Sequence, residues 1–297
     1  MAKTVNNYKK IVDLRLNKVY QYNLREFQLR SVCLLEAIDK VCKKYGIQYY
    51  IIAGTLLGAV RHKGFIPWDD DMDIAFMRPD YDLLMEHADE WVPAPFSVVN
   101  YRNCAHYPKY FAKLEDTSTT IVERFYLGYA GGIYMDIFPL DKVPDNIIRR
   151  YIHYRRFNHA RKMLYFAYRD PYKRGRGPKS WLPRLIQKCY SREKLHERCE
   201  KILTEYRDSK NCNYVMTHDD GFKAYKIDIF GEPSHLTFEG VEAAAPKIPD
   251  GFLSVIYGKN YMQLPPEKER RSHFHDYCDL NTPYADFDIN SLFKTKQ

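Results

Sequence analysis

The sequence predicts an α/β fold of the α+β type, with a helical insertion packed beside the core. Two observations support this prediction. In the first half of the chain, amphipathic helical patterns lie before and between short apolar runs, an order typical of an α/β core. From residue 146 the pattern becomes basic, aromatic and helical, and strand-like runs return only after about residue 213. We therefore expect a core region over 1–145, a basic helical insertion over 146–210 and a segment over 211–297 that completes the core.

The elements of the first region have clear boundaries. Residues 24–45 carry apolar side chains at helical spacing, and Gly46 ends this helix, as glycine commonly does just past a C-terminus. The apolar run over 48–53 predicts a central strand, which Gly54-Thr55 breaks before a short helix over 56–62. Further along we expect a strand over 72–77, a helix over 79–90, and strands over 96–100, 107–114, 119–123 and 133–138.

The second half is predicted to be mostly helical before it returns to short strands. Residues 146–170 read as a long helix with many basic and aromatic side chains, and 171–178 as a loop because of its glycines and prolines. Two more helices are expected over 180–190 and 192–206, and a last one over 251–258.

Composition is that of an ordinary soluble globular protein, with 297 residues, 45% hydrophobic and 28% charged. No stretch approaches the roughly 18 apolar residues that span a bilayer, and the first fifteen residues carry no apolar region typical of a secretory signal. The seven cysteines are odd in number and include no C-x-x-C pair, so they predict neither a disulfide framework nor a zinc site. We expect reduced thiols in a cytoplasmic protein.

The net charge is 46 − 38, or +8, which favours anionic partners such as nucleotides, phosphosugars, acidic lipids or nucleic acid. It is equally compatible with a protein that its net charge keeps soluble. Basic stretches interleaved with aromatics, such as 165–176, can bind single-stranded nucleic acid. We expect no nucleic-acid partner and favour helices that rest on an anionic membrane, with a merely solvated insertion as the alternative.

The candidate site begins in Trp68-Asp69-Asp70-Asp71-Met72-Asp73. If this segment is extended, Asp69, Asp71 and Asp73 point to one face, and Asp70 faces away. Three carboxylates on one face raise one another's pKa unless a cation lies between them. Mg²⁺ prefers one or two carboxylates plus waters and substrate phosphates, and Asp71 and Asp73 stand at the start of a strand where they could provide that pair. The alternative is an acidic surface turn.

Two further features accompany the aspartates. Gly54-Thr55 follows a strand and opens a helix, so its backbone N–H groups could bind a phosphate; the alternative is a turn without a ligand. Asp136 lies in an apolar strand, where a single charge is expensive to bury. It could complete a metal site, take a proton from an attacking hydroxyl, or be bound to a buried arginine or to backbone amides.

These motifs resemble the signature of the LicD family, which includes bacterial phosphocholine transferases and is related to fukutin and fukutin-related protein. The resemblance is carried by GTLLGAVRH over 54–62 and GFIPWDDDMD over 64–73. Supporting matches lie at 113–120, 135–141, 238–241, 257–258 and 264–273. The resemblance thus runs from about residue 24 to 275, and the basic middle is its least family-like part.

The resemblance implies a nucleotidyltransferase-type core with a mixed sheet, in which Gly54-Thr55 is the Gly-Ser-like turn. Asp71 and Asp73 would be the metal pair, and Asp136 the third carboxylate. Family members transfer a phosphorylated alcohol from a CDP-linked donor to a sugar hydroxyl. We therefore expect Mg²⁺, with Mn²⁺ as the alternative, as cofactor, and CDP-choline or another CDP-alcohol as donor.

The candidate catalytic and metal-binding residues are thus Asp71, Asp73 and Asp136. Arg61 and Lys113 are candidate diphosphate contacts. Arg61 ranks first because the guanidinium fork suits phosphate oxygens, whereas a lysine at a strand end is more often solvated. A choline headgroup would require aromatic faces, which 107–111 and 125–134 could supply. The candidate substrate-binding residues are Gly54, Thr55, Arg61, His62, Asp69, Lys113 and His273.

The expected function is transfer of phosphocholine from CDP-choline to a hydroxyl of a glycan or its lipid-linked precursor, with release of CMP. The product would be a cell-surface polysaccharide such as teichoic acid or lipopolysaccharide. Three alternatives stay open: transfer of ribitol, glycerol or ethanolamine phosphate from its CDP donor, nucleotidyl transfer from an NTP, and a basic nucleic-acid-binding protein. We expect a cytoplasmic enzyme, with peripheral contact at the inner face of the plasma membrane as an option.

Overall fold

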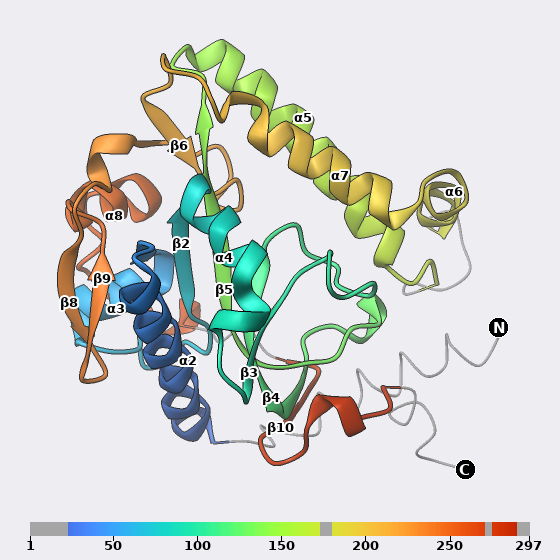
Figure 1. The fold of residues 1–297 in the computed structure, drawn as a ribbon, viewed down its shortest axis with the longest axis horizontal. Helices are drawn as coiled ribbons and strands as arrows, with labels where there is room; N and C mark the ends of the chain where they lie inside the picture. Colours follow the sequence, from blue (N-terminus) through green and yellow to red (C-terminus); the bar gives the residue numbers. More distant parts are fainter. Residues whose placement is uncertain (1–22, 173–179, 271–274, 290–297) are drawn as a thin grey trace.

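The computed structural model describes residues 23–172, 180–270 and 275–289 (Figure 1). Its centre is a mixed sheet whose main strands are, in spatial order, β1 (Tyr49–Ile51), β2 (Asp73–Met77), β5 (Gly131–Val143), β4 (Ala112–Val122) and β10 (Tyr277–Asp279). β2 and β5 are parallel, and the other neighbours along this path are antiparallel. This mixed sheet with flanking helices confirms the predicted α+β class.

Three shorter strands extend the sheet. They are β3 (Phe96–Val99) beside β4, β6 (Tyr214–Met216) beside β5, and β7 (Tyr225–Lys226) beside β6. β6, β7 and β10 come from the C-terminal part of the chain, so the sheet combines segments that are far apart in sequence. The division of the chain into three regions stays a prediction.

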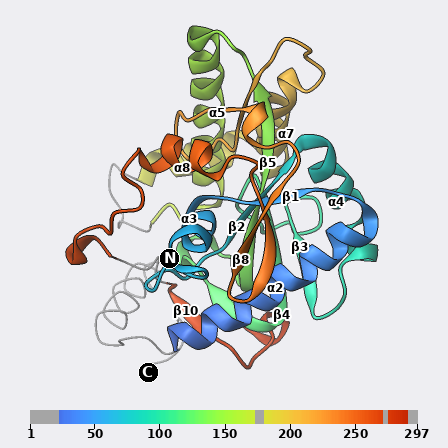
Figure 2. The ribbon, with the colours of Figure 1, turned by 90° about the vertical axis from the view of Figure 1, so that its left-hand side faces the viewer.

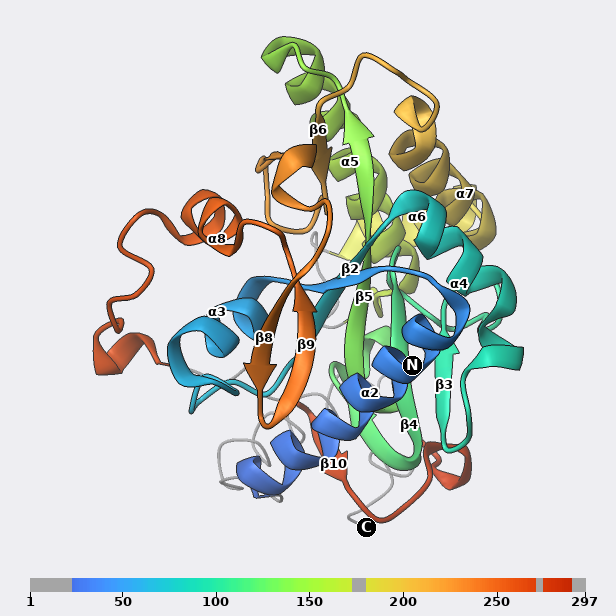
Figure 3. The same ribbon diagram turned by 60° about the vertical axis from the view of Figure 1, so that its left-hand side comes forward.

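A helix and a hairpin lie side by side over one face of the sheet (Figures 2 and 3). They are α2 (Leu24–Tyr45) and the pair β8 (Ser234–Phe238) and β9 (Val241–Ala245). Asn23 caps the start of α2, and Gly46 ends it in the left-handed conformation with a φ of 69°. Leu35 and Ile38 of its inner face are fully buried. Burial of such a side chain is worth about 1.5–3 kcal/mol, so packing holds this helix in place.

Two helices follow directly from core strands, and a third packs against one of them. α3 (Ala53–His62) begins after β1, α4 (Arg78–Trp91) after β2, and α8 (Pro249–Tyr257) lies against α3. Pro79 stands in the first turn of α4, where its missing N–H removes no helical hydrogen bond. All three helices are confirmed, with ends that differ from the predicted ones by at most three residues.

The insertion is helical, as predicted. It consists of α5 (Ile147–Tyr168), α6 (Trp181–Cys189) and α7 (Arg192–Leu203), and α5 packs against both of the others (Figure 1). Most of the loop expected over 171–178 lies outside the described residues. Within the described ranges, no helix has the length and apolar character needed to cross a membrane.

The strand predictions between 107 and 123 were wrong. No strand covers 107–111, and β4 is one strand over the region where two were expected. The polar residues that suggested a break lie at an irregularity in the pairing of β4 with β5. There the Thr119 hydroxyl donates to the Asp116 carbonyl at 2.9 Å and accepts from the Ile133 N–H at 2.7 Å. These bonds satisfy polar groups inside the sheet, so the strand continues.

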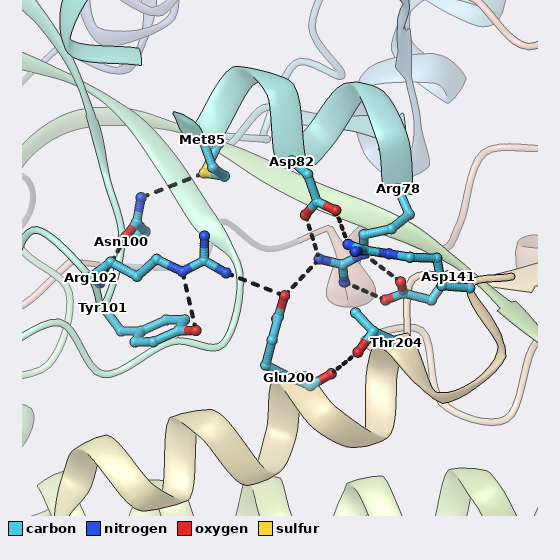
Figure 4. A network of polar contacts seen from close by, with 10 residues as sticks. Arg78, Asp82, Met85, Asn100, Tyr101, Arg102, Asp141, Glu200 and Thr204 are labelled. Carbon is cyan, nitrogen blue, oxygen red and sulfur yellow. Dashed lines mark hydrogen bonds and ion pairs between the residues drawn. The ribbon is translucent and has the colours of Figure 1, made fainter. Parts of the chain in front are cut away.

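A buried ion-pair network joins the core to the insertion (Figure 4). Arg78, at the start of α4, donates to the two carboxylate oxygens of Asp141 at 2.6 and 2.7 Å. Its third nitrogen donates to Glu200 of α7 at 3.1 Å. The side chains of Arg78 and Asp141 are only 4% and 1% exposed, so each charge requires its partner. Because α7 packs against α5, the network also positions α5 relative to the sheet.

We predict that Arg78→Ala lowers the free energy of unfolding by about 3–5 kcal/mol, because it leaves the Asp141 carboxylate buried without its partner. Urea denaturation followed by circular dichroism measures this loss. Arg102→Ala is the matched control, since Arg102 is 54% exposed and lies 3.5 Å from the same Glu200. Equal losses in the two variants would contradict the role given to the buried pair.

Candidate active site

A cavity of about 820 Å³ lies between the sheet, α5 and the C-terminal part of the chain. Asp69, Asp71, Asp73 and Asp136 all line it, together with Gly54 at the start of α3. Asp69, Asp71 and Asp73 therefore meet at one cavity as expected, although only Asp73 belongs to a strand, so strand alternation is not what brings them together.

Strand pairing places the key side chains in a row. Asp73 of β2 lies directly beside Asp136 of β5, and Lys113 of β4 lies beside Asp136 on the other side. Residues paired across neighbouring strands project from the same face of a sheet. The two carboxylates therefore lie side by side on the floor of the cavity, and the buried Lys113 lies next to Asp136 without lining the cavity itself.

Local contacts hold the loop before β2 in place. The Thr55 hydroxyl accepts a hydrogen bond from the Asp73 N–H at 2.8 Å, and the Gln28 amide donates to the Asp69 carbonyl at 2.8 Å. A Cβ atom at Gly54 would lie 2.8 Å from the Asp69 carboxylate. Only glycine therefore allows that carboxylate to approach the start of α3 so closely.

Burial and mutual repulsion raise the pKa values of two of these carboxyl groups. Burial, Asp71 and Asp136 together raise the pKa of Asp73 well above its ordinary value. Burial also raises the pKa of Asp136 to about 6, although Lys113 and Lys109 oppose the shift. Such crowding costs free energy when the groups are ionised, unless a cation offsets it.

One oxygen of Asp136 has no hydrogen-bond donor among the described residues. This buried Oδ1 lies 3.3 Å from the Lys113 ammonium group, which instead donates to Glu123 at 2.6 Å. This oxygen therefore has an ion-pair partner but no hydrogen bond, and a metal ion or a substrate proton would give it the direct contact that it lacks.

The carboxylates around the cavity fit a divalent ion of the Mg²⁺ type. Within the described ranges, no group of three or more His, Cys, Asp or Glu side chains is arranged to hold an ion by itself. Mg²⁺ does not require such a group, because one or two carboxylates, waters and substrate phosphates complete its octahedral shell. The residues therefore fit an ion held by a pair such as Asp71 and Asp73 and completed by substrate.

Two expectations about side-chain exposure were wrong. Lys113 is not solvated but 1% exposed, and its ammonium group lies 3.0 Å from the centroid of the Tyr134 ring. Asp70 does not face outward but is 1% exposed, with a carboxylate oxygen 3.8 Å from Nδ1 of His275. The reason for the second error is that β2 begins only at Asp73, so the preceding residues do not alternate as in a strand.

Among the described residues, the candidates Thr55, Arg61, His62 and Lys113 do not line the cavity. The Arg61 guanidinium donates to the carbonyl oxygens of Tyr261 at 3.1 Å and Gln263 at 3.4 Å, and His62 lies beside it. The Thr55 hydroxyl oxygen accepts a hydrogen bond from the Asp73 backbone N–H. His273 lies outside the described residues. Substrate contacts by these residues, Lys113 and His273 included, stay predictions.

Sequence reasoning missed the basic side of the cavity. The insertion supplies part of the wall, and positions 158, 161 and 165 of α5 follow the three-and-four spacing of one helix face. That spacing could have shown that these positions share one face of the helix. It could not have shown that this face lies near the aspartates. The missed lining residues include Lys109, Glu123, Arg124, Asn158, Arg161, Lys162, Asp219, Asp220, Lys223, Tyr257 and His275.

Aromatic rings line the same cavity. Tyr110 and Phe111 come from one of the two aromatic stretches identified in the sequence, and Tyr126 and Tyr134 from the other. Their faces could surround a quaternary ammonium group, which aromatic rings attract electrostatically.

The comparisons agree with this geometry. Residues 46–170 match the family described as LicD/FKTN/FKRP, nucleotidyltransferase domain, and this range contains all four carboxylates. The chain is 28% identical to the lipopolysaccharide cholinephosphotransferase LicD of Haemophilus influenzae over 268 residues, which cover 84% of this chain and 95% of the relative. An uncharacterized protein of Rickettsia typhi is 44% identical over 64 residues, 21% of each chain. One of Rickettsia prowazekii is 51% identical over 47 residues, 16% of this chain and 18% of the other.

We predict that Mg²⁺ raises the melting temperature more at pH 7 than at pH 5. Unfolded aspartates titrate near 3.9, whereas burial raises the pKa of Asp136 to about 6 and shifts Asp73 in the same direction. The folded chain therefore binds more protons between about pH 4 and 6, and the contribution of these groups to stability falls as the pH rises through that window. At pH 5 protons compete with the ion for the same oxygens.

Differential scanning fluorimetry with MgCl₂ or EDTA measures the effect. An ion at about one hundred times its Kd stabilises by about 2.7 kcal/mol. Asp73→Asn should remove most of the Mg²⁺ shift, and Asp89→Asn, at an exposed position of α4, should keep it. A shift that is equal at both pH values, or that persists in Asp73→Asn, would show that the ion binds elsewhere.

Proposed function

We propose, from the premise that this chain is a LicD-family phosphotransferase, that it transfers phosphocholine from CDP-choline to a hydroxyl of a cell-surface glycan or its lipid-linked precursor. The observation that carries the proposal is the convergence of Asp69, Asp71, Asp73 and Asp136 on one cavity that also has basic and aromatic walls. The similarity to a lipopolysaccharide cholinephosphotransferase over most of both chains supports the choice of phosphocholine and of a glycan acceptor.

The chemistry balances with the residues present. The acceptor oxygen attacks the phosphorus that carries choline, the bond from that phosphorus to the bridging oxygen breaks, and CMP leaves. In such reactions the protein mainly positions the reactants and neutralises charge. A bound Mg²⁺, held by Asp71 and Asp73, would supply neutralisation of the diphosphate. Asp136 would take the proton of the acceptor hydroxyl, since its raised pKa of about 6 suits a general base near neutral pH.

The basic wall would bind the phosphate oxygens of the donor. Lys109 donates to Glu123 at 3.1 Å, and Arg161 to Asp219 at 2.7 Å, so both groups are held in fixed positions at the cavity. Lys162 lines the cavity from an exposed position on α5. Positively charged groups at these points would offset the two negative charges of a CDP-alcohol.

The proposal also includes the place of the reaction. A lipid-linked glycan would be presented at the inner face of the plasma membrane, and a cytoplasmic enzyme in peripheral contact with that face could reach it. The exposed basic residues of the insertion outside the cavity, such as Arg149 and Arg155, support contact with an anionic surface.

A second CDP-alcohol and a nucleoside triphosphate are the competing donors. The aromatic lining favours choline, whose quaternary ammonium binds aromatic faces, over ribitol, glycerol or ethanolamine phosphate. Incubation of the chain with Mg²⁺ and each donor in turn separates these possibilities. Release of CMP from CDP-choline supports the proposal, and release of pyrophosphate from an NTP alone would overturn it.

We predict that Asp71→Asn and Asp73→Asn each reduce CMP release at least about a hundredfold, because each removes a metal ligand. Both should leave the circular dichroism spectrum intact, since neither residue belongs to the apolar core. Asp89→Asn should retain full activity. Retained activity in either site variant would mean that these carboxylates do not bind the essential ion.

A further inference from the structure

The first two turns of α5 expose an unusual number of large apolar side chains. Ile147, Ile148 and Ile152 are 64%, 67% and 53% exposed, and Tyr151 is 47% exposed. We name these four residues the α5 apolar face. The turns that carry it project beyond the end of the sheet (Figure 3). Exposed apolar side chains grouped in this way mark a surface that contacts another molecule.

This face is continuous with the wall of the cavity. Positions 147, 151, 154, 158, 161 and 165 follow one side of the helix, and the last three of them line the cavity. The distance from 147 to 158 is about 16 Å at 1.5 Å per residue.

The segment that contains Phe222 and Lys223 also links the α5 apolar face to the cavity. The Phe222 ring packs against Tyr151 at 5.3 Å and against Tyr154 at 5.6 Å between ring centroids. The next residue, Lys223, lines the cavity. The apolar surface therefore leads into the cavity along two neighbouring segments of the chain.

Two exposed basic side chains flank the α5 apolar face, and one acidic residue precedes it. Arg149 lies within the first two turns of α5 and Arg155 in the next turn, where its guanidinium donates to the Tyr151 hydroxyl at 3.4 Å. Asp145, which precedes the helix, accepts two hydrogen bonds from Asn213 at 2.6 and 2.7 Å. Aliphatic and aromatic side chains flanked by basic ones match the boundary between the headgroups and acyl chains of an anionic bilayer.

We propose that the α5 apolar face inserts into the headgroup region of an anionic membrane and thereby sets the mouth of the cavity against the bilayer. An acceptor that a lipid holds in that membrane would then enter the cavity along α5. This second part rests on the proposed function, whereas membrane docking does not. A depth of about 5–10 Å, typical of interfacial helices, would cover the isoleucines.

Sedimentation of the full chain with vesicles tests the docking. The chain should bind vesicles of phosphatidylcholine with phosphatidylglycerol more tightly than vesicles of phosphatidylcholine alone, and added salt should weaken this binding. The double variant Ile147→Ser/Ile148→Ser should reduce the partition coefficient at least about tenfold, since burial of one such side chain is worth more than that factor. Isoleucine and serine have similar helix propensities, so α5 should persist.

Leu29→Ser is the matched control, because Leu29 is 50% exposed on α2 and lies outside the α5 apolar face. It should bind vesicles as the unchanged chain does. Equal binding of the double variant, or no binding of the unchanged chain to anionic vesicles, overturns the proposal. A third outcome would also overturn the proposal. If the unchanged chain does not bind vesicles but forms a concentration-dependent dimer, and the double variant does not form that dimer, the partner of this face is a second copy of the chain.

Basal release of CMP from CDP-choline without vesicles separates this proposal from the proposed function. The double variant should keep that basal rate, because neither isoleucine lines the cavity. Vesicle binding that the double variant loses would support docking even if no donor released CMP, an outcome that would refute only the proposed function.

Discussion

The parallel pairing of β2 with β5 is the constraint on which the rest of the site depends. It places Asp73 beside Asp136, and the antiparallel pairing of β4 then adds Lys113 on the far side. Two neighbouring carboxylates in a buried position repel each other. Their shifted pKa values show that this arrangement opposes folding when both are ionised. The proposed ligand, by neutralising the carboxylates, would offset this cost.

Several other contacts position the remaining parts of the cavity around this pair of strands. Thr55 and Gln28 hold the loop that carries the other aspartates, and Gly54 leaves room for the Asp69 carboxylate. On the other side, the Arg78 network ties α7 to the core, and α7 supports α5. The insertion is therefore part of the cavity, to which it contributes a wall of positive charge. The acidic floor and the basic wall together suit a ligand that carries both phosphate and a bound cation.

The sequence predicted the acidic part of the site well. Alternating aspartates before an apolar strand, and one isolated aspartate within another, are local signals that need no knowledge of the fold. Lys113 could not be assigned in this way, because its burial depends on which residue of β5 it lies beside. The irregularity near Thr119 that joins the two predicted strands into β4 is equally a product of long-range pairing. Asp70 was misjudged because strand periodicity was extended to residues that precede the strand. Pairing register, more than residue type, limited the prediction within the sheet, whereas the contribution of α5 depends on how the helix packs beside the sheet, which its own spacing does not show.

The most direct test of the central claim is the anomalous scattering of Mn²⁺ in crystals of the chain grown with CDP-choline. The account predicts an anomalous peak within coordination distance of Asp71 and Asp73, about 2.0–2.4 Å from their oxygens, with the diphosphate against the same ion and the basic wall. A diphosphate bound outside the cavity, or a peak that contacts neither aspartate, would contradict it.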